Sequence, residues 1–279
     1  MRLILIAAAG LAATLGTAHA QSPVERGRYL VDTVMTCQNC HTPKGPTGDI
    51  AGKALSGGLK FDEPPFTVTA PNITQDSETG IGKWTDAELK SFMTTGVRPN
   101  GVPVVPLMPT GYYKILTPGD LDAIVAYLRT VGPIKNEVAA PVYRAPMQQE
   151  VFPGAEKPMS PADLNDKVKR GFYLATIAHC MECHTPMDKG RHLYDTRLGT
   201  GGQKFPGPWG ESTARNITSH KTAGIGGWTD AEIKRAITHG VRRDGAALKP
   251  PMGYGYYAKM TDTDLDAVVA WLRTVPPLE

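Results

Sequence analysis

The chain has 279 residues, of which 41% are hydrophobic and 20% are charged. This apolar content supports a packed core and excludes an intrinsically disordered chain, while 30 glycines and 24 prolines predict many loops. The formal charge is only +3 and the basic residues form no cluster, which excludes the electrostatic pattern of a nucleic-acid-binding protein.

The first twenty residues have the pattern of a cleaved export signal. Arg2 precedes an apolar run over residues 3–16, and Ala18-His19-Ala20 has the small-x-small form of a cleavage site. The run is shorter than the roughly 20 residues that a membrane-spanning helix needs. We therefore expect residues 1–20 to be removed, leaving an exported, soluble chain that begins near Gln21 and has no membrane segment.

All four cysteines fall in two copies of one pentapeptide, CQNCH at 37–41 and CMECH at 180–184. The spacing Cys-x-x-Cys-His is typical of covalent attachment of c-type haem. Two thiols one helical turn apart reach the two vinyl groups of a porphyrin, and the adjacent imidazole ligates the iron. The predicted attachment residues are Cys37, Cys40, Cys180 and Cys183, and the predicted proximal ligands are His41 and His184.

Two other cysteine chemistries compete with haem attachment. A thioredoxin-like redox pair would follow a strand of a βαβ unit, whereas residues 24–34 before the first motif have a helical pattern. A zinc site would have to join cysteine pairs 143 residues apart and would leave the two histidines unexplained. We therefore expect two covalently attached haem c groups.

The second half of the chain repeats the first, with an offset of 144 residues outside the motifs and 143 at the motifs themselves. The repeated stretches include RGRYL at 26–30 with RGFYL at 170–174, GIGKWTDAE at 80–88 with GIGGWTDAE at 224–232, and DLDAIVAYLRTV at 120–131 with DLDAVVAWLRTV at 264–275. We predict one domain at residues 21–132 and a second at residues 162–279. Residues 133–161 between them are rich in proline without a helical or strand period, which predicts a semi-extended linker.

Three helices and much loop are expected in each copy. Thr85 and Glu88 form a capping box that opens a short helix, and Gly96 is expected to end it. Thr117 with Pro118 begins the last helix. The corresponding residues of the second copy are Thr229, Glu232, Gly240 and Thr261. No strand pattern competes, so we predict an all-α fold.

Each proximal histidine leaves one axial position of its iron open, and ten methionines and seven histidines are candidates. The repeat separates them: Met93 corresponds to Ile237, whereas Met108 and Met252 correspond to each other and each lies in a proline-rich loop. We predict that Met108 and Met252 are the distal ligands, which raises the reduction potential. The alternative is that both are core residues.

Both halves resemble class I cytochrome c domains, and the chain as a whole is similar to exported diheme cytochromes c related to the cytochrome subunits of bacterial periplasmic dehydrogenases. The resemblance rests on the two Cys-x-x-Cys-His motifs and the paired methionines. It implies two small helical domains, each wrapped around one covalent haem, and a location in the periplasm. In that fold a small residue of the first helix lets the last helix cross closely. The pairs Gly27 with Tyr127 and Gly171 with Trp271 match this pattern.

Four further repeated residues are candidates for contact with haem propionates. The indole N–H groups of Trp84 and Trp228 can donate to a propionate, and Arg98 and Arg242 can neutralise one. The alternative is a packed tryptophan and a solvated arginine.

Two repeated backbone features are expected near the histidines. Pro43 and Pro186, two residues after each ligand, are expected to place a carbonyl near the imidazole N–H. Asn72 and Asn216 are expected to satisfy loop backbone, and the alternative is a contact with a haem propionate.

Three classes of function fit two haems. The chain is an electron carrier, an enzyme such as a diheme peroxidase or sulfur-compound oxidoreductase, or a haem sensor. Paired methionines would close the sixth coordination position of both irons against a substrate, which favours the carrier. We therefore expect no catalytic residues, and as partners a donor dehydrogenase and an acceptor cytochrome or oxidase.

Overall fold

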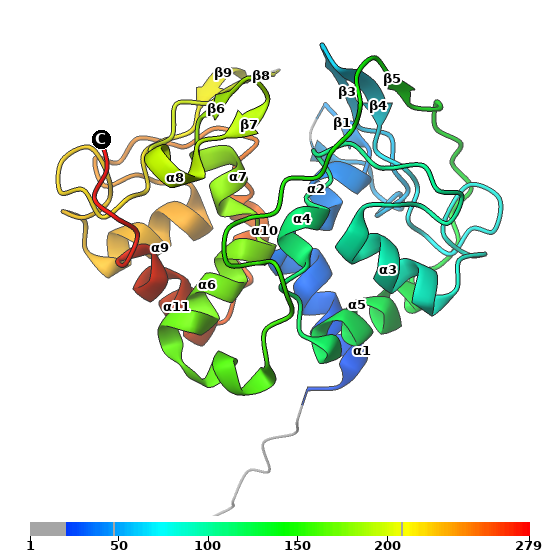
Figure 1. The fold of residues 1–279 in the computed structure, drawn as a ribbon, viewed down its shortest axis with the longest axis horizontal. Coiled ribbons are helices and arrows are strands. Elements are labelled where there is room, and N and C mark those ends of the chain that lie inside the picture. The colour runs from blue at the N-terminus through cyan, green and yellow to red at the C-terminus, as the bar shows by residue number, and fades with distance from the viewer. Residues whose placement is uncertain (1–20, 47, 208) are drawn as a thin grey trace, which may run out of the picture.

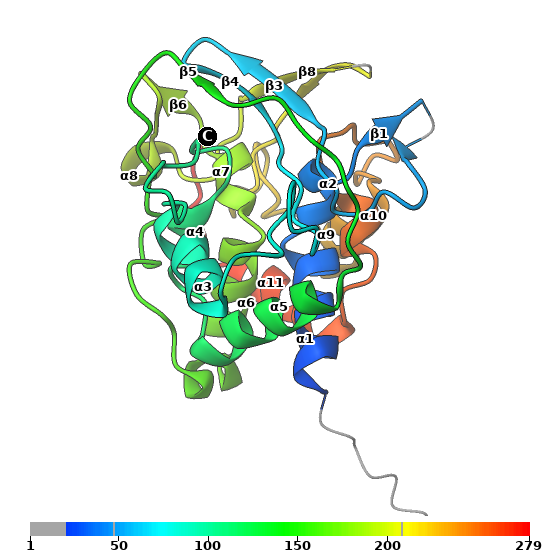
Figure 2. The same ribbon diagram turned by 90° about the vertical axis from the view of Figure 1, so that its right-hand side faces the viewer.

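The computed structural model describes residues 21–46, 48–207 and 209–279, so the expected export signal at residues 1–20 lies outside the described part. The chain forms two similar halves that lie side by side, with helices at the lower end and short strands at the upper end (Figure 1). A turned view shows the same separation of helices from strands (Figure 2). Among the described residues, no helix has the length and hydropathy needed to cross a membrane.

The helices follow the same order in the two halves. The first half contains α1 (Pro23–Tyr29), the π-helical segment η1 (Leu30–Val34), α2 (Cys37–His41), α3 (Asp86–Thr95), α4 (Thr110–Tyr113) and α5 (Pro118–Thr130). The second half contains the 3₁₀-helical segment η2 (Pro161–Asn165), α6 (Lys167–Ile177), α7 (Cys180–His184), α8 (Tyr194–Arg197), α9 (Asp230–His239), α10 (Tyr254–Tyr257) and α11 (Asp262–Leu272).

The expected helix boundaries are confirmed where they depend on capping residues. The Thr85 side chain accepts from the backbone N–H of Glu88, whose carboxylate bonds back to the cap, and α3 ends at Gly96 in the left-handed conformation (φ 71°). Helix α5 begins after the N-cap Thr117, with Pro118 in its first position. Helices α9 and α11 of the second half repeat these caps.

A π-helical segment explains why the two motifs are offset by one residue less than the rest of the repeat. The first helix of the first half passes through η1, which holds an extra residue per turn, before it reaches α2. The corresponding α6 is α-helical throughout and leads into α7. The π turn thus absorbs one residue of the first half inside the helix.

The first and last helices of each half cross in close contact. A Cβ atom on Gly27 of α1 would lie 1.9 Å from the carbonyl oxygen of Ala123 on α5, and one on Gly171 of α6 would lie 1.9 Å from that of Ala267 on α11. Only glycine lets the two backbones approach this closely. The expected crossing is therefore present in both halves.

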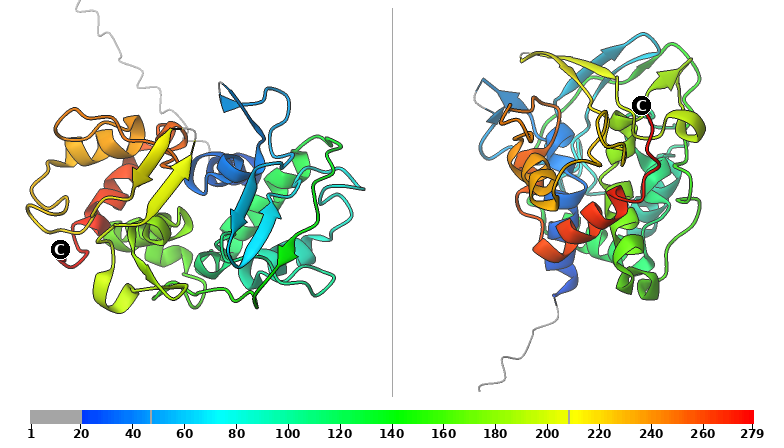
Figure 3. Two further views of the ribbon diagram at one scale, coloured as in Figure 1. Left: turned by 90° about the horizontal axis from the view of Figure 1, so that it is seen from above. Right: turned by 90° about the vertical axis from the view of Figure 1, so that its left-hand side faces the viewer.

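The expected all-α class is too strict, because the described residues also form nine short strands. These strands pair in antiparallel hairpins within loops rather than in a core sheet. They are β1 (Lys44–Gly45), β2 (Gly48–Asp49), β3 (Lys60–Glu63), β4 (Phe66–Thr69), β5 (Val142–Tyr143), β6 (Met187–Asp188), β7 (Arg191–His192), β8 (Lys204–Gly207) and β9 (Gly210–Thr213). Figure 3 shows the β3–β4 and β8–β9 hairpins above the helices of their own halves.

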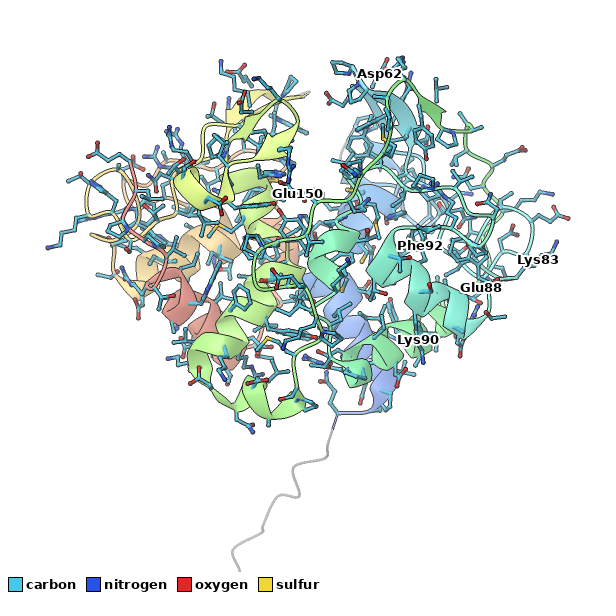
Figure 4. All side chains as sticks on the ribbon, in the orientation of Figure 1. Asp62, Lys83, Glu88, Lys90, Phe92 and Glu150 are labelled. Atoms are coloured by element: carbon cyan, nitrogen blue, oxygen red, sulfur yellow. The ribbon has the colours of Figure 1, made fainter. Side chains whose placement is uncertain are left out.

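The segment between the halves packs against both of them. Its strand β5 adds to β4 as the third strand of a small sheet of the first half. The amide of Gln149 donates to the carbonyl of Val104 in the first half (3.2 Å), and Glu150 accepts from His192 Nδ1 in the second (2.7 Å). Glu150 accordingly lies at the boundary of the halves (Figure 4). Phe152 is 2% exposed, so this segment forms part of the protein interior.

Candidate functional site

Each Cys-x-x-Cys-His motif forms one short helix that a left-handed residue sets apart from the preceding helix. Thr36 has φ 49° before α2, and His179 has φ 45° before α7. This conformation is strained for residues other than glycine, and such strain concentrates at functional sites. In each helix the two cysteines are three residues apart, which places both thiols on one face. All four thiols are free of disulfides.

Burial makes these thiols poor acids. It raises the pKa of Cys37 and Cys180 to about 12 and, with the neighbouring charge of Glu182, that of Cys40 to about 11. The pKa of Cys183 is raised further for the same first reason. Redox-active thioredoxin-like cysteines have lowered pKa values. The buried surroundings of these four thiols are therefore not those of a thiol–disulfide exchange site.

The two histidines predicted to be proximal ligands donate to backbone carbonyls that the sequence did not single out. Nδ1 of His41 lies 2.8 Å from the carbonyl oxygen of Pro71, and Nδ1 of His184 lies 2.6 Å from that of Arg215. Pro71 and Arg215 are themselves 144 residues apart.

The expected contacts with the carbonyls of Pro43 and Pro186 are wrong. These two carbonyls accept instead from the backbone N–H groups of Ile50 and Leu193, each at 2.9 Å. The carbonyls of Pro43 and Pro186 close the turn that follows each motif. Each imidazole instead donates to a carbonyl about 30 residues further along the chain.

The expected role of the repeated asparagines is confirmed. Oδ1 of Asn72 accepts from the backbone N–H of Thr74 at 2.9 Å, and its Nδ2 donates to the carbonyl of Ile134 at 2.7 Å. Asn216 makes the same bond to Leu278 at 2.7 Å. Each asparagine therefore fixes the loop that begins directly after Pro71 or Arg215. The repeated Asn-Ile-Thr was thus the feature of the sequence that marks the carbonyl bonded to each histidine.

These contacts determine which imidazole nitrogen is available. A carbonyl oxygen only accepts, so Nδ1 of His41 and of His184 carries the hydrogen. Burial lowers the pKa of both rings, which favours the neutral form with a lone pair on Nε2. Within the described ranges, no protein group bonds to Nε2 of either ring. Paired thiols and a free imidazole nitrogen on one short helix are the donors that a c-type haem requires.

Backbone hydrogen bonds hold each motif helix against the loop behind it. The carbonyl of His41 accepts from Gly57 N–H at 2.6 Å, and that of His184 accepts from Gly201 N–H at 2.7 Å. Gly57 has φ 79°, and a Cβ there would lie 2.5 Å from the carbonyl oxygen of Ala70. Glycine is required at this position because both the conformation and the space exclude a side chain.

The two paired methionines lie where the loops pass the core. Met108 and Met252 are both partly buried and pack against the same hydrophobic cluster as Cys37 and Cys180. Each lies two residues before a short helix, Met108 before α4 and Met252 before α10. Their role as distal ligands stays a prediction.

The residues predicted to contact the haem propionates differ in whether protein groups already bind their donor atoms. Trp84 is half-buried and packs edge-on against Phe92 at 5.4 Å between ring centroids, and within the described residues no protein group accepts from its indole N–H. The same holds for the indole N–H of Trp228. Arg98 donates to the carbonyl of Pro103 and to the hydroxyl of Tyr143, and Arg242 pairs with Asp244 at 3.1 Å. Both arginines therefore already have protein partners, unlike the two tryptophans.

Comparison with known proteins agrees with the repeat. A family model described as Cytochrome c matches residues 24–132 and again residues 168–276. The chain is 30% identical to the cytochrome c subunit of a quinone alcohol dehydrogenase from Gluconacetobacter polyoxogenes, over 99% of this chain and 62% of the relative. It is also 30% identical to a diheme c-type cytochrome from Cereibacter sphaeroides, over 87% of this chain and 83% of the relative.

A fructose dehydrogenase cytochrome subunit from Gluconobacter japonicus is 28% identical, over 94% of this chain and 54% of the relative. The chain thus spans about three fifths or less of the length of these dehydrogenase subunits. Two matched domains and the two haem attachment motifs give the protein two covalently bound haem c groups. The chain belongs to the cytochrome c family.

Proposed function

We propose that this protein is a periplasmic electron carrier that accepts electrons from a dehydrogenase and passes them to a downstream cytochrome or oxidase. The observation that carries the proposal is the same imidazole geometry in both halves, with Nδ1 committed to a carbonyl and Nε2 free. Dehydrogenase cytochrome subunits among the relatives support the choice of donor. The export pattern of residues 1–20 supports the location.

In this proposal the residues of each motif hold one haem. Cys37 and Cys40 would bind the first through thioethers, and His41 would present Nε2 to its iron. Cys180, Cys183 and His184 do the same in the second half. When bound, each haem supplies reversible one-electron chemistry at its iron.

The remaining residues of the site tune and protect that chemistry. The bond from His41 to Pro71 holds the ring in one orientation and raises its strength as a ligand. Met108 and Met252 would complete the coordination of the two irons, and the indole N–H groups of Trp84 and Trp228 would donate to propionates. Arg98 and Arg242 add positive charge nearby. A closed coordination sphere would leave a substrate no place to bind, which favours a carrier over an enzyme.

The proposal is tested with the purified holoprotein and a periplasmic quinone-dependent dehydrogenase. We expect stoichiometric reduction of two haems per chain by the dehydrogenase and its substrate, and reoxidation by a soluble cytochrome or a membrane oxidase. Turnover with hydrogen peroxide or thiosulfate should be negligible. Rapid peroxidase turnover by the intact protein, with no reduction by any dehydrogenase, would contradict the carrier assignment.

A further inference from the structure

The two halves are joined by a pair of crossed tyrosine contacts. Tyr173 extends from α6 to the beginning of α5 in the other half. Its hydroxyl donates to Oδ2 of Asp120 at 2.6 Å and accepts from the backbone N–H of Thr117 at 3.4 Å. Tyr173 is fully buried and Asp120 is 7% exposed. The tyrosine thereby completes the N-terminal hydrogen bonding of a helix to which it does not belong.

The reverse contact is made by the corresponding atoms of the other half. Tyr29 extends from α1 to the beginning of α11, where its hydroxyl donates to Oδ2 of Asp264 at 2.6 Å and accepts from the backbone N–H of Thr261 at 3.3 Å. Asp264 is 1% exposed. Each half therefore inserts one hydroxyl into the last helix of the other.

Each of these aspartates is also paired with an arginine of its own half. Arg26 donates from Nε and Nη2 to the two carboxylate oxygens of Asp120, both at 2.8 Å. Arg170 donates from Nε to Asp264 at 2.6 Å. The arginine places a positive charge beside each buried carboxylate, and hydrogen bonds within such charged pairs are stronger than those between neutral groups.

The tyrosines are mechanically connected to the haem attachment motifs. Tyr29 ends α1, and the helix continues through η1 towards Cys37 only eight residues later. Tyr173 lies on α6, seven residues before Cys180. A shift of either crossed contact would therefore displace the chain that leads through Thr36 or His179 into the attachment helix.

The first attachment region also touches the opposite half directly. The amide of Asn39, inside the first motif, donates to the carbonyl of Pro251 at 3.3 Å, beside Met252 of the second half. A Cβ on Gly253 would lie 3.5 Å from the methyl group of Thr36. In Figures 1 and 2, α2 and α7 lie at the same height on either side of the boundary.

We infer that the crossed tyrosine–aspartate contacts set the spacing of the two haem sites, and that Tyr29, Tyr173, Asp120 and Asp264 are positioning residues for electron exchange between the haems of one molecule. This inference rests on the proposed electron-transfer function. With both haems bound, one electron would pass from the ferrous iron of one half to the ferric iron of the other. No bond forms or breaks and no proton is transferred.

The test uses the holoprotein and the double variant Tyr29→Phe with Tyr173→Phe, which keeps both rings and removes both hydroxyls. Exchange spectroscopy of haem methyl resonances in half-reduced protein measures the exchange rate, and dilution separates intramolecular from intermolecular exchange. Each substitution removes one hydrogen bond that joins the two halves, so we expect the intramolecular rate to fall below that of the wild type. The splitting of the Soret circular dichroism by haem–haem coupling should shrink in parallel.

Tyr127→Phe is the matched control, because the Tyr127 hydroxyl donates to Asp32 at 2.7 Å entirely within the first half. The control should keep the wild-type rate and dichroism. Equal rates in the wild type and the double variant, or the same loss in the control, would overturn the inference. If the double variant does not fold, either single variant carries the same test, and an unchanged rate in both singles overturns it.

The outcomes also separate this inference from the proposed function. Fast reduction of both haems by a dehydrogenase, with an exchange rate indifferent to the tyrosines, removes the positioning role and leaves the carrier. A tyrosine-dependent exchange rate in a protein that no dehydrogenase reduces removes the donor assignment and leaves the positioning role.

Discussion

An imidazole that ligates iron must offer one nitrogen, and the partner of the other nitrogen decides which. In this protein that partner is the carbonyl of Pro71 or Arg215. A carbonyl leaves no signature in the amino-acid sequence, because every residue has one. The sequence therefore predicted His41 from its motif but assigned the wrong carbonyl, that of Pro43. The usable signal was Asn72, whose side chain fixes the loop in question.

The paired methionines give a prediction at this scale. Replacing Met108 or Met252 by His is expected to lower the reduction potential of that haem by ~0.1 V or more, within the roughly 0.8 V that axial ligands span. The sulfur-to-iron charge-transfer absorption of that haem should disappear. Spectroelectrochemistry of each variant measures both effects.

Met93 supplies the control, because it is buried in the core and has no methionine counterpart in the second half. Met93→Leu should change neither the potentials nor the absorption band. An intact band in both histidine variants would show that other side chains are the distal ligands.

Among the elements, those set by local residues were predicted best. The helices capped by Thr85 and Thr117 begin as expected, because a cap and its partner lie within one turn. The strands were missed because they are two to four residues long and lie in loops rich in glycine and proline. Even the alternation of apolar and polar residues in β4 covers only four residues. The π turn η1 was visible only as one residue of misfit between the copies.

The crossing of α1 and α5 gives a prediction at the scale of elements. Gly27→Ala is expected to destabilise the protein by about 3 kcal/mol, because the new methyl group would meet the backbone of Ala123 and the helices must separate. Gly171→Ala should act alike on α6 and α11. Urea unfolding followed by far-ultraviolet circular dichroism measures the change in the free energy of unfolding.

Gly119 is the matched control within α5. A Cβ at this position has no heavy atom within 4 Å, so Gly119→Ala should leave the free energy of unfolding unchanged or raise it by up to about 1 kcal/mol. Equal effects at Gly27 and Gly119 would mean that the close crossing does not limit stability.

The docking of the two halves belongs to the whole molecule, and the sequence did not predict it. Tyr29 and Asp264 are 235 residues apart, and each recurs at the matching position of the other copy. Such recurrence is equally compatible with a contact inside one half and with a contact between halves. Only the packing of the assembled chain selects the crossed pairing. The same holds for the segment 133–161, whose buried Phe152 contributes to the interior between the halves.

The crossed tyrosines predict a dependence of stability on alkaline pH. Burial, together with Asp264, raises the pKa of Tyr29 to about 12, and burial raises that of Tyr173 well above its ordinary value. A tyrosine with a raised pKa stabilises the folded state fully below its ordinary pKa near 10 and loses that contribution as the pH rises through the folded value.

We therefore compare the wild type with the double variant Tyr29→Phe and Tyr173→Phe by urea unfolding between pH 7 and pH 12, the upper limit being the pKa of Tyr29. The difference in free energy of unfolding should be constant up to about pH 10 and then shrink steadily. A difference that stays constant up to pH 12 would show that the two hydroxyls are not held in protected contacts.

The crossed contacts are arranged like those across the interface of a symmetric dimer. In a two-fold interface between identical chains, residue i of one chain meets residue j of the other and the reverse contact follows automatically. Here Tyr29 meets Asp264 and Tyr173 meets Asp120, although both contacts lie in one covalent chain. In a true homodimer every substitution would appear at both sites at once. Joining the copies in one chain releases that constraint, so the two haem environments can diverge independently, as Asn39 and Glu182 at the same place in the two motifs already do.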